Sequence, residues 1–431
     1  MSSATTSSVS SSFNSGAAAS SSKIERKGNV ATLSTSAGYQ TNLTAVDTYG
    51  NTFQVPDYTI KDILSAIPAH CYQRRLLQSL FYVFRDMTCM VVLGYLANNY
   101  VADIPSPYLR FAAWAGYVWM QGLFGTGLWV LAHECGHQAF SDYGWVNDLV
   151  GWILHSYLLV PYFSWKFSHG KHHKATGHLT RDMVFVPKTK EQFLKARGFD
   201  DLEDLLGDSP IYSLTQLIVQ QTFGWIGYLF ANLSGQKFPG KSWWQVSHFN
   251  PSSLIFEKKD YYYILLSDVG ILVQATVIYL WYQNFGAFNF AVNYLLPYFL
   301  VNHWLVFITY LQHSDPQMPH YEAHQWTFAR GAAATIDREF GFVGKHIFHD
   351  IIETHVLHHY VSRIPFYNAR EASEAIKKVM GIHYQHSDEN MWVSLWKSAR
   401  WCQFVDGKNG VMMYRNTNGF GVDPKKETVK K

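Results

Sequence analysis

The chain has 431 residues, of which 48% are hydrophobic and 16% aromatic, and only 16% are charged. Soluble domains usually contain about 25% charged residues, so the composition indicates a membrane protein. The net charge of +3 gives no electrostatic ground for a nucleic-acid partner, and that class of function is excluded. The four cysteines show no paired spacing, so neither a disulfide framework nor a thiolate metal site is expected.

Both ends of the chain are predicted to be cytosolic tails. Residues 1–55 are rich in Ser, Ala, Thr and Gly, and such a segment buries too little apolar surface to offset the entropy lost on ordering. It also lacks the continuous apolar stretch of a secretory signal. Residues 406–431 are expected to form the C-terminal tail, which leaves residues 56–405 as the membrane domain.

Four stretches approach the roughly 20 apolar residues needed to cross a bilayer. They lie at about 80–101, 108–131, 261–284 and 290–312. The loops inside each pair carry no Lys or Arg, whereas basic residues gather between the pairs and outside them, so the loops within the pairs are predicted to be lumenal. The predicted fold is an all-α integral membrane protein with four transmembrane helices in two hairpins and a cytosolic helical cap. Two shorter apolar stretches, near 147–163 and 213–233, are expected to lie at the interface or re-enter the membrane.

Three histidine clusters follow the spans, and the two hairpins return all of them to the cytosolic face. Spacings of three and four residues place side chains on one face of a helix, so each cluster offers its imidazoles in one direction. Eight imidazoles exceed what one ion binds, since zinc takes four ligands and other first-row ions about six. Two metal ions are therefore predicted. The clusters contain His133 and His137, then His169, His172 and His173, then His355, His358 and His359.

The chemistry of the two metals is indicated by their surroundings. Imidazole suits iron, zinc and copper alike, but the clusters lie beside aromatic-rich spans that can line a slot for an apolar chain. A lipid is the expected substrate. Attack on an unactivated C–H bond requires a redox metal and dioxygen, and a ligand set made only of nitrogen favours this reaction over hydrolysis.

These motifs resemble those of the membrane fatty-acyl desaturases, and within that family the fungal relatives of the microsomal oleate Δ12 (omega-6) desaturases. The resemblance covers roughly residues 80–400 and rests on the three clusters in order, on residues 151–187, on the Thr309–His313 stretch TYLQH and on the Glu353–His359 stretch ETHVLHH. It implies a di-iron centre, dioxygen as co-substrate, and electrons from NADH through cytochrome b5 and its reductase. It also implies a phospholipid-bound oleoyl chain as substrate and residence in the endoplasmic reticulum membrane.

On this resemblance the eight clustered histidines are the expected iron ligands, and His313 is the ninth. The chain contains no haem-binding HPGG motif, so the electron donor is expected to be a separate protein.

Four further residues are candidates to hydrogen-bond ligand imidazoles, because such partners fix the ring tautomer. They are Glu134, Asp182, His349 and Asp350. His349 lies six residues before His355, about 240° around a helix, and so is not expected among the ligands themselves. His178, His248 and His320 are expected on the surface or in loops.

Alternatives remain open inside and outside the family. An omega-3 (Δ15) desaturase or a lipid hydroxylase would carry the same motifs, since the outcome depends on the shape of the slot. The first cluster is also an HExxH sequence, which in zinc proteases uses the Glu, here Glu134, as general base. A protease has no use for two HxxHH clusters. A metal transporter would place its ligands within the spans rather than beside them.

Overall fold

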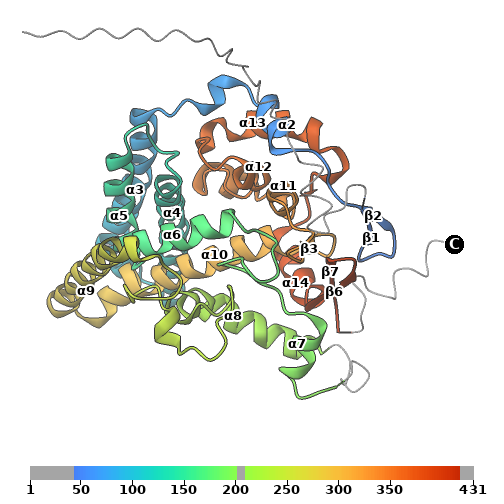
Figure 1. Ribbon diagram of the computed structural model, residues 1–431. Helices are drawn as coiled ribbons and strands as arrows, with labels where there is room; N and C mark the ends of the chain where they lie inside the picture. Colours follow the sequence, from blue (N-terminus) through green and yellow to red (C-terminus); the bar gives the residue numbers. More distant parts are fainter. Residues whose placement is uncertain (1–42, 201–208, 418–431) are drawn as a thin grey trace, which may run out of the picture. The chain divides into compact units, whose positions relative to one another are not determined.

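The computed structural model describes residues 43–200 and 209–417, which are mostly helical (Figure 1). The α-helices are α2 (Ile60–Ala66), α3 (Leu76–Tyr100), α4 (Pro107–Gly136), α5 (Gly144–Tyr157), α6 (Tyr162–His173), α7 (Lys190–Lys195), α8 (Pro210–Ala231), α9 (Tyr261–Phe290), α10 (Leu296–His313), α11 (Phe328–Ala332), α12 (His355–Tyr360), α13 (Phe366–Met380) and α14 (Met391–Trp401). Shorter 3₁₀ turns are η1 (Ala69–Tyr72), η2 (Val101–Asp103), η3 (Trp243–Val246), η4 (Lys258–Asp260) and η7 (Gly381–His383), and two π-helical turns are η5 (Ala291–Leu295) and η6 (Val343–Ile347). The strands are β1 (Thr44–Val46), β2 (Thr52–Gln54), β3 (Pro319–Tyr321), β4 (Asp337–Arg338), β5 (His386–Ser387), β6 (Phe404–Lys408) and β7 (Val411–Arg415).

Helix α4 carries the first histidine cluster into the core. It begins with Ser106, whose side chain accepts a hydrogen bond from the N–H of Leu109, and with Pro107 in the first turn, where the missing N–H costs nothing. Its second half is buried and packs against α3, α5 and α10. At Gly127 an added Cβ would lie 2.5 Å from the carbonyl oxygen of Ile347, so only glycine permits this close approach.

Helices α9 and α10 form a hairpin that reverses at Gly286. This residue has φ 77° and ψ 174°, a conformation that is essentially restricted to glycine. Beyond it, the side chain of Tyr294 comes within hydrogen-bond reach of Gln274. In a straight helix residues that far apart in sequence would be separated by about 30 Å. The reversal therefore brings η5 back against α9, after which α10 packs on α4 and α8 and carries His313 to the clusters.

Within residues 43–200 and 209–417, two helical segments are long and apolar enough to cross a membrane, Leu76–Asp103 and Lys258–His313. The second has 56 residues and is divided by the break at Gly286, so it contains the predicted third and fourth spans. The predicted second span lies in α4, which does not reach the same hydropathy because it is rich in Gly, Trp and Tyr. Length and composition thus support a membrane protein with two such segments.

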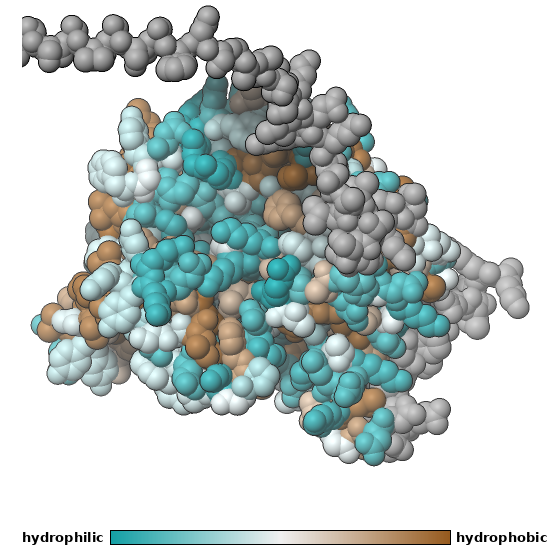
Figure 2. Space-filling model, viewed as in Figure 1, coloured by the Kyte–Doolittle hydropathy of each residue, from teal (hydrophilic) through white to brown (hydrophobic). Residues whose placement is uncertain are grey.

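Apolar side chains are exposed along both segments. Figure 2 shows hydrophobic atoms where α9 lies, at the left of the view, and mainly hydrophilic atoms over α7 and α14. Exposed examples are Phe81, Phe84, Val91 and Tyr95 on α3, and Tyr262, Leu272, Val273 and Phe285 on α9. Such a surface is compatible with lipid rather than with water.

The prediction of an all-α fold omits three small sheets. Antiparallel β1 and β2 form one, β3, β7 and β6 form a second in that order, and parallel β4 and β5 form a third. Residues 43–55 and 406–415, which the composition assigns to the tails, therefore pair in strands. Their apolar residues Leu43, Val55, Val411 and Met413 are buried, and this burial offsets the ordering entropy on which the tail prediction depends.

Candidate metal centre

The nine histidines predicted as ligands come from four helices that converge in the core. The first cluster ends α4, the second ends α6, the third forms α12, and His313 ends α10. At Gly151 an added Cβ would lie 2.3 Å from the ring of Tyr162, so glycine lets α5 pack closely on the start of α6. The structure brings all nine imidazoles together and divides them into two groups.

The first group contains five histidines, and each offers one ring nitrogen within 4.8 Å of the others. The Nε2 atoms of His133 and His169 lie 3.1 Å apart, and those of His169 and His173 lie 3.2 Å apart. Two nitrogens bound at about 2.1 Å to one ion, at a right angle, would be about 3 Å apart. These spacings fit shared coordination. The members are His133, His137, His169, His173 and His358.

The second group contains His172, His313 and His359, again within 4.8 Å of one another. His355 joins it, because its Nε2 lies 3.1 Å from Nε2 of His313. The two groups adjoin, since the rings of His173 and His359 stack with their centroids 4.2 Å apart. The arrangement therefore offers two neighbouring metal sites rather than one.

The protonation of these rings also fits metal binding. Burial lowers the pKa of His137, His169 and His173 well below the ordinary value, and neighbouring histidines add to the effect. This shift favours the neutral form of the rings, which is the form that binds metals. The Nε2 atoms of His137, His358 and His359 are buried and have no hydrogen-bond partner among the described residues. Buried polar atoms without a partner are costly, and a bound metal ion would satisfy them.

Two ligand candidates are oriented by hydrogen bonds through Nδ1. The carboxylate of Asp182 accepts one from His172 Nδ1–H at 2.6 Å. The hydroxyl of Thr176 donates to the carbonyl oxygen of His172 and so accepts from His359 Nδ1–H at 3.0 Å. Both bonds leave Nε2 free for a metal, as is usual in metal sites. Thr176 was not predicted, because only its position in the fold brings it beside His359.

The other three predicted partners lie elsewhere. Glu134 is buried and accepts the N–H of Phe366 at 3.1 Å, and its second oxygen is 4.0 Å from Nδ1 of His133. His349 Nε2 lies 2.8 Å from the carboxylate of Asp86 in α3. Asp350 pairs with Arg370. Among the described residues neither His349 nor Asp350 hydrogen-bonds a clustered histidine.

Three further histidines, predicted on the surface or in loops, are buried, although His178 and His248 do lie in turn segments and only His320 lies in a strand, β3. His178, His248 and His320 are 2%, 0% and 3% exposed. His248 lies 3.0 Å through Nε2 from the hydroxyl of Ser168, next to the ligand candidate His169. The ring of His320 packs against Tyr414 in the sheet that the sequence pattern does not indicate. Burial depends here on contacts between distant segments.

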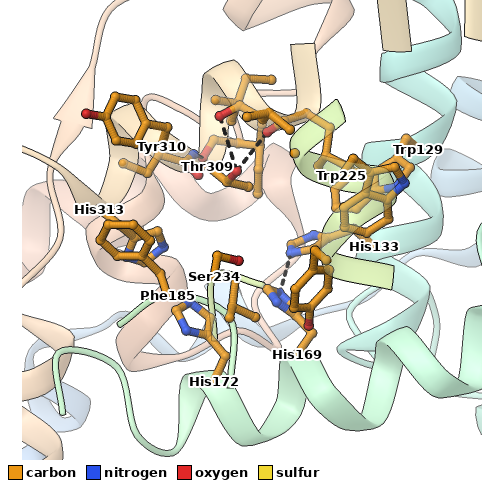
Figure 3. Close-up of a pocket in the computed structure, with 18 of the residues that line it drawn as sticks. Trp129, His133, His169, His172, Phe185, Trp225, Ser234, Thr309, Tyr310 and His313 are labelled. Carbon is orange, nitrogen blue, oxygen red and sulfur yellow. Dashed lines mark hydrogen bonds between the residues drawn. The ribbon is translucent and has the colours of Figure 1, made fainter. Parts of the chain in front are cut away.

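A pocket touches both histidine groups (Figure 3). His133 and His169 of the first group line it together with His172, His313 and His355 of the second. The remaining lining is mainly apolar or aromatic, and most of it comes from α4, α8 and α10. It includes Trp129, Val130, Trp225, Leu305, Val306 and Ile308. An apolar chain in this pocket would lie against both candidate metal sites.

Comparison with known proteins identifies similar chains. The family model described as fatty acid desaturase matches residues 112–389, a region that contains all nine histidines. An oleate hydroxylase of Claviceps purpurea is 51% identical over 408 residues, covering 88% of this chain and 85% of that protein. A Δ12 fatty acid desaturase of Mortierella isabellina is 44% identical over 372 residues, covering 84% and 92%. A Δ12 fatty-acid desaturase of Arabidopsis thaliana is 42% identical over 366 residues, with the same coverage.

Proposed function

Because this chain belongs to the fatty acid desaturase family, we propose that it introduces a cis double bond at the Δ12 position of a phospholipid-bound oleoyl chain and so forms linoleoyl. The observation that carries the proposal is the apolar pocket lined by histidines of both groups. Several relatives that match 84% of this chain are named Δ12 desaturases.

Two iron ions would occupy the two histidine groups. The first would be held by His133, His137, His169, His173 and His358, and the second by His172, His313, His355 and His359. When bound, such an iron pair supplies the oxidation of an unactivated C–H bond by dioxygen. The chain itself orients the imidazoles through Asp182 and Thr176, holds the acyl chain against both sites, and excludes water with Trp129, Trp225 and Leu305.

The surrounding architecture completes the proposal. Four spans in two hairpins would place the three clusters on the cytosolic side of the endoplasmic reticulum membrane, where a helical cap of residues up to about 405 holds the irons. Electrons would come from NADH through cytochrome b5 and its reductase, with dioxygen as co-substrate. The exposed apolar surface of α3 and α9 and the reversal of the chain at Gly286 support this arrangement.

A second candidate is an oleate hydroxylase, and the 51% identity to a protein of that name favours it. The two reactions diverge after the first hydrogen has been abstracted. Loss of a second hydrogen gives the double bond, whereas transfer of oxygen gives an alcohol. Since the same metal centre serves both reactions, the ligand set does not distinguish them.

Expression in a host that makes only monounsaturated lipids separates these functions. Gas chromatography with mass spectrometry of total fatty acids should show linoleate, which is absent from the host and from cells that express His358→Ala. A hydroxylated C18:1 product instead of linoleate would replace the main proposal by the hydroxylase. A C18:3 product, formed when linoleate is fed, would indicate the omega-3 alternative. No new fatty acid at all would contradict the proposed function.

A further inference from the structure

Strand β4 lies between the end of α10 and the start of α12, which together carry three of the four histidines of the second group. The N–H of Ile336, just before the strand, donates to the carbonyl oxygen of Gln312 in the last turn of α10, at 3.2 Å. The N–H of Arg338 donates to the carbonyl oxygen of Ile352, just before α12, at 3.1 Å. This short segment therefore connects the ends of the two helices to each other.

The side chain of Asp337 in β4 caps α12 from outside the helix. A helix of six residues is not stable by itself, and Thr354, which precedes α12, makes no capping hydrogen bond through its side chain. The carboxyl group of Asp337 instead accepts the N–H of Val356 at 2.7 Å, and the N–H of His355 is within hydrogen-bond reach of it. N–H groups in the first turn have no partner inside their own helix. The position of the third cluster therefore depends on Asp337.

Asp337 is itself held in one orientation. Its second carboxyl oxygen accepts a hydrogen bond from the hydroxyl of Tyr384. The backbone of β4 pairs with β5, where Asp337 lies opposite His386. The residue is 0% exposed, so water does not compete for its hydrogen bonds. The cap of α12 is thus a fixed part of the core rather than a mobile surface group.

The next residue, Arg338, binds the end of α10 in the complementary way. Its Nε–H donates to the carbonyl oxygen of Leu311 at 3.0 Å, and a terminal nitrogen donates to that of Ser314 at 3.4 Å. Carbonyl oxygens in the last turn of a helix have no partner inside that helix. The guanidinium also pairs with Asp315 at 2.9 Å, and Arg338 is 2% exposed. His313 lies between the bonded carbonyl groups, so its backbone is held on both sides.

These contacts act mainly on the second histidine group. The Nε2 atoms of His313 and His355 lie 3.1 Å apart, and each imidazole extends from a helix end that Arg338 or Asp337 holds. In the first group only His358 belongs to α12, whereas the other four members come from α4 and α6. A displacement of α10 or α12 would therefore disturb most ligands of the second group and one of the first.

We propose that Asp337 and Arg338 are positioning residues that set the geometry of the second metal site. Asp337 fixes the start of α12 and Arg338 fixes the end of α10, so that His313, His355 and His359 keep the distances that one ion requires. The inference rests on the proposed function and deepens it, since it names residues without contact to the imidazoles on which binding of the second ion depends.

The test removes Fe²⁺ from the purified, iron-loaded protein with increasing amounts of a chelator, without dioxygen, and yields one Kd for each site. His359→Ala identifies the Kd of the second site, because it removes one ligand from that group. In Asp337→Ala this Kd should rise about 10- to 100-fold, as is typical when a residue that supports metal ligands is lost, and the Kd of the first site should change much less. Asp337→Asn keeps an acceptor oxygen for the N–H of Val356 and should restore most of the affinity.

Arg338→Lys is an independent variant at the other helix end. Lysine keeps the charge but lacks the planar fork that reaches Leu311 and Asp315 together. This variant should also weaken mainly the second site, and it decides the question if Asp337→Ala does not fold. Thr59→Ala is the matched control, since it removes the N-terminal cap of α2, a helix of seven residues without histidine. It should leave both Kd values unchanged.

Any of three results would overturn the inference. Asp337→Ala and Arg338→Lys could keep both wild-type Kd values, or they could weaken the two sites equally, as a general loss of structure would. Asp337→Asn could also weaken the second site as much as Asp337→Ala does, which would exclude the hydrogen bond to α12 as the cause. Failure of the proposed function is distinguishable, because the wild-type protein itself would then bind fewer than two iron ions or form no oxidised product from the oleoyl lipid.

Discussion

The imidazoles of the second group are oriented by residues outside the three clusters. Asp182 holds His172 and Thr176 holds His359, each through Nδ1. Nε2 of His137 and Nε2 of His358 in the first group are buried without a partner among the described residues, and so is Nε2 of His359 in the second. Both groups therefore gain from a bound metal, because an unsatisfied buried nitrogen costs free energy that coordination recovers.

The ligand assignment is tested by removing one imidazole at a time. His172→Ala, His358→Ala and His313→Ala each delete a metal-bonding nitrogen, so iron per protein should fall clearly and desaturation should vanish. His346→Ala is the control, since this histidine lies close in sequence to the third cluster but is exposed, and it should keep both iron and activity. Iron is measured by inductively coupled plasma mass spectrometry of the purified variants.

The His313→Ala variant gives the most informative result. His313 was predicted as a ligand only from the resemblance to the desaturases and from its position at the end of the last predicted span. Full iron and full activity in His313→Ala would reduce the site to eight histidines. The same result in His172→Ala or His358→Ala would contradict the di-iron proposal itself.

Site residues that belong to a local sequence pattern could be predicted from the sequence, whereas site residues outside such a pattern could not. The clustered histidines are recognisable by spacings of three and four, which one helical face explains. Thr176 belongs to no such pattern. It can be recognised as the hydrogen-bond partner of His359 only once the fold has brought the end of α6 next to α12. His349 is a candidate partner of the ligands by proximity in sequence, yet its left-handed backbone, with φ 55°, turns it toward Asp86 of α3.

Among the elements, the hairpin of α9 and α10 depends on a single residue. Gly286→Ala introduces a side chain at φ 77° and ψ 174°, so it should destabilise the protein by about 1–3 kcal/mol. Gly116→Ala is a matched control. Neither position has any atom within 4 Å of an added Cβ, but Gly116 lies inside helix α4, where alanine is favoured by about 0.5–1 kcal/mol.

The two variants are compared by thermal unfolding in detergent. A lower midpoint for Gly286→Ala together with an equal or higher midpoint for Gly116→Ala would establish that backbone conformation, and not crowding, requires the glycine. Equal midpoints for wild type and Gly286→Ala would show that the reversal tolerates another residue.

Helices were predictable as elements, whereas strands were not. Long apolar stretches mark α3, α9 and α10 whatever their surroundings. The strand β3 has three residues and pairs with β7, about ninety residues further along the chain. Pairing over such a separation leaves little trace in the local sequence, because neither strand is long enough to show alternation. The short sheet nevertheless matters for the site, since the hydroxyl of Tyr414 in β7 donates to the carbonyl oxygen of His313.

At the scale of the whole molecule, the histidines can share one site only if the number of membrane crossings between successive clusters is even. In the proposed topology two spans precede the first and second clusters and two more precede the third, so four crossings would return all nine histidines to one face. The convergence of the nine imidazoles from α4, α6, α10 and α12 is compatible with this proposed topology. By length and hydropathy, two segments of the described residues are candidates to cross the membrane. The second is divided at Gly286 and can therefore supply two crossings.

The orientation of these crossings is tested with inserted glycosylation acceptors. A flexible loop with an Asn-X-Thr sequon, placed between Asp103 and Pro107 where η2 joins α4, should be glycosylated because this connection is predicted to be lumenal. The same loop placed after Gly240 should stay unmodified. The natural sequon at Asn232 should also stay unmodified, since this residue is 3% exposed and its amide donates to the carbonyl oxygen of Gln236. An endoglycosidase-sensitive shift of the Gly240 insertion would place the second cluster on the lumenal side, away from the proposed electron donor, and would contradict the two-hairpin topology.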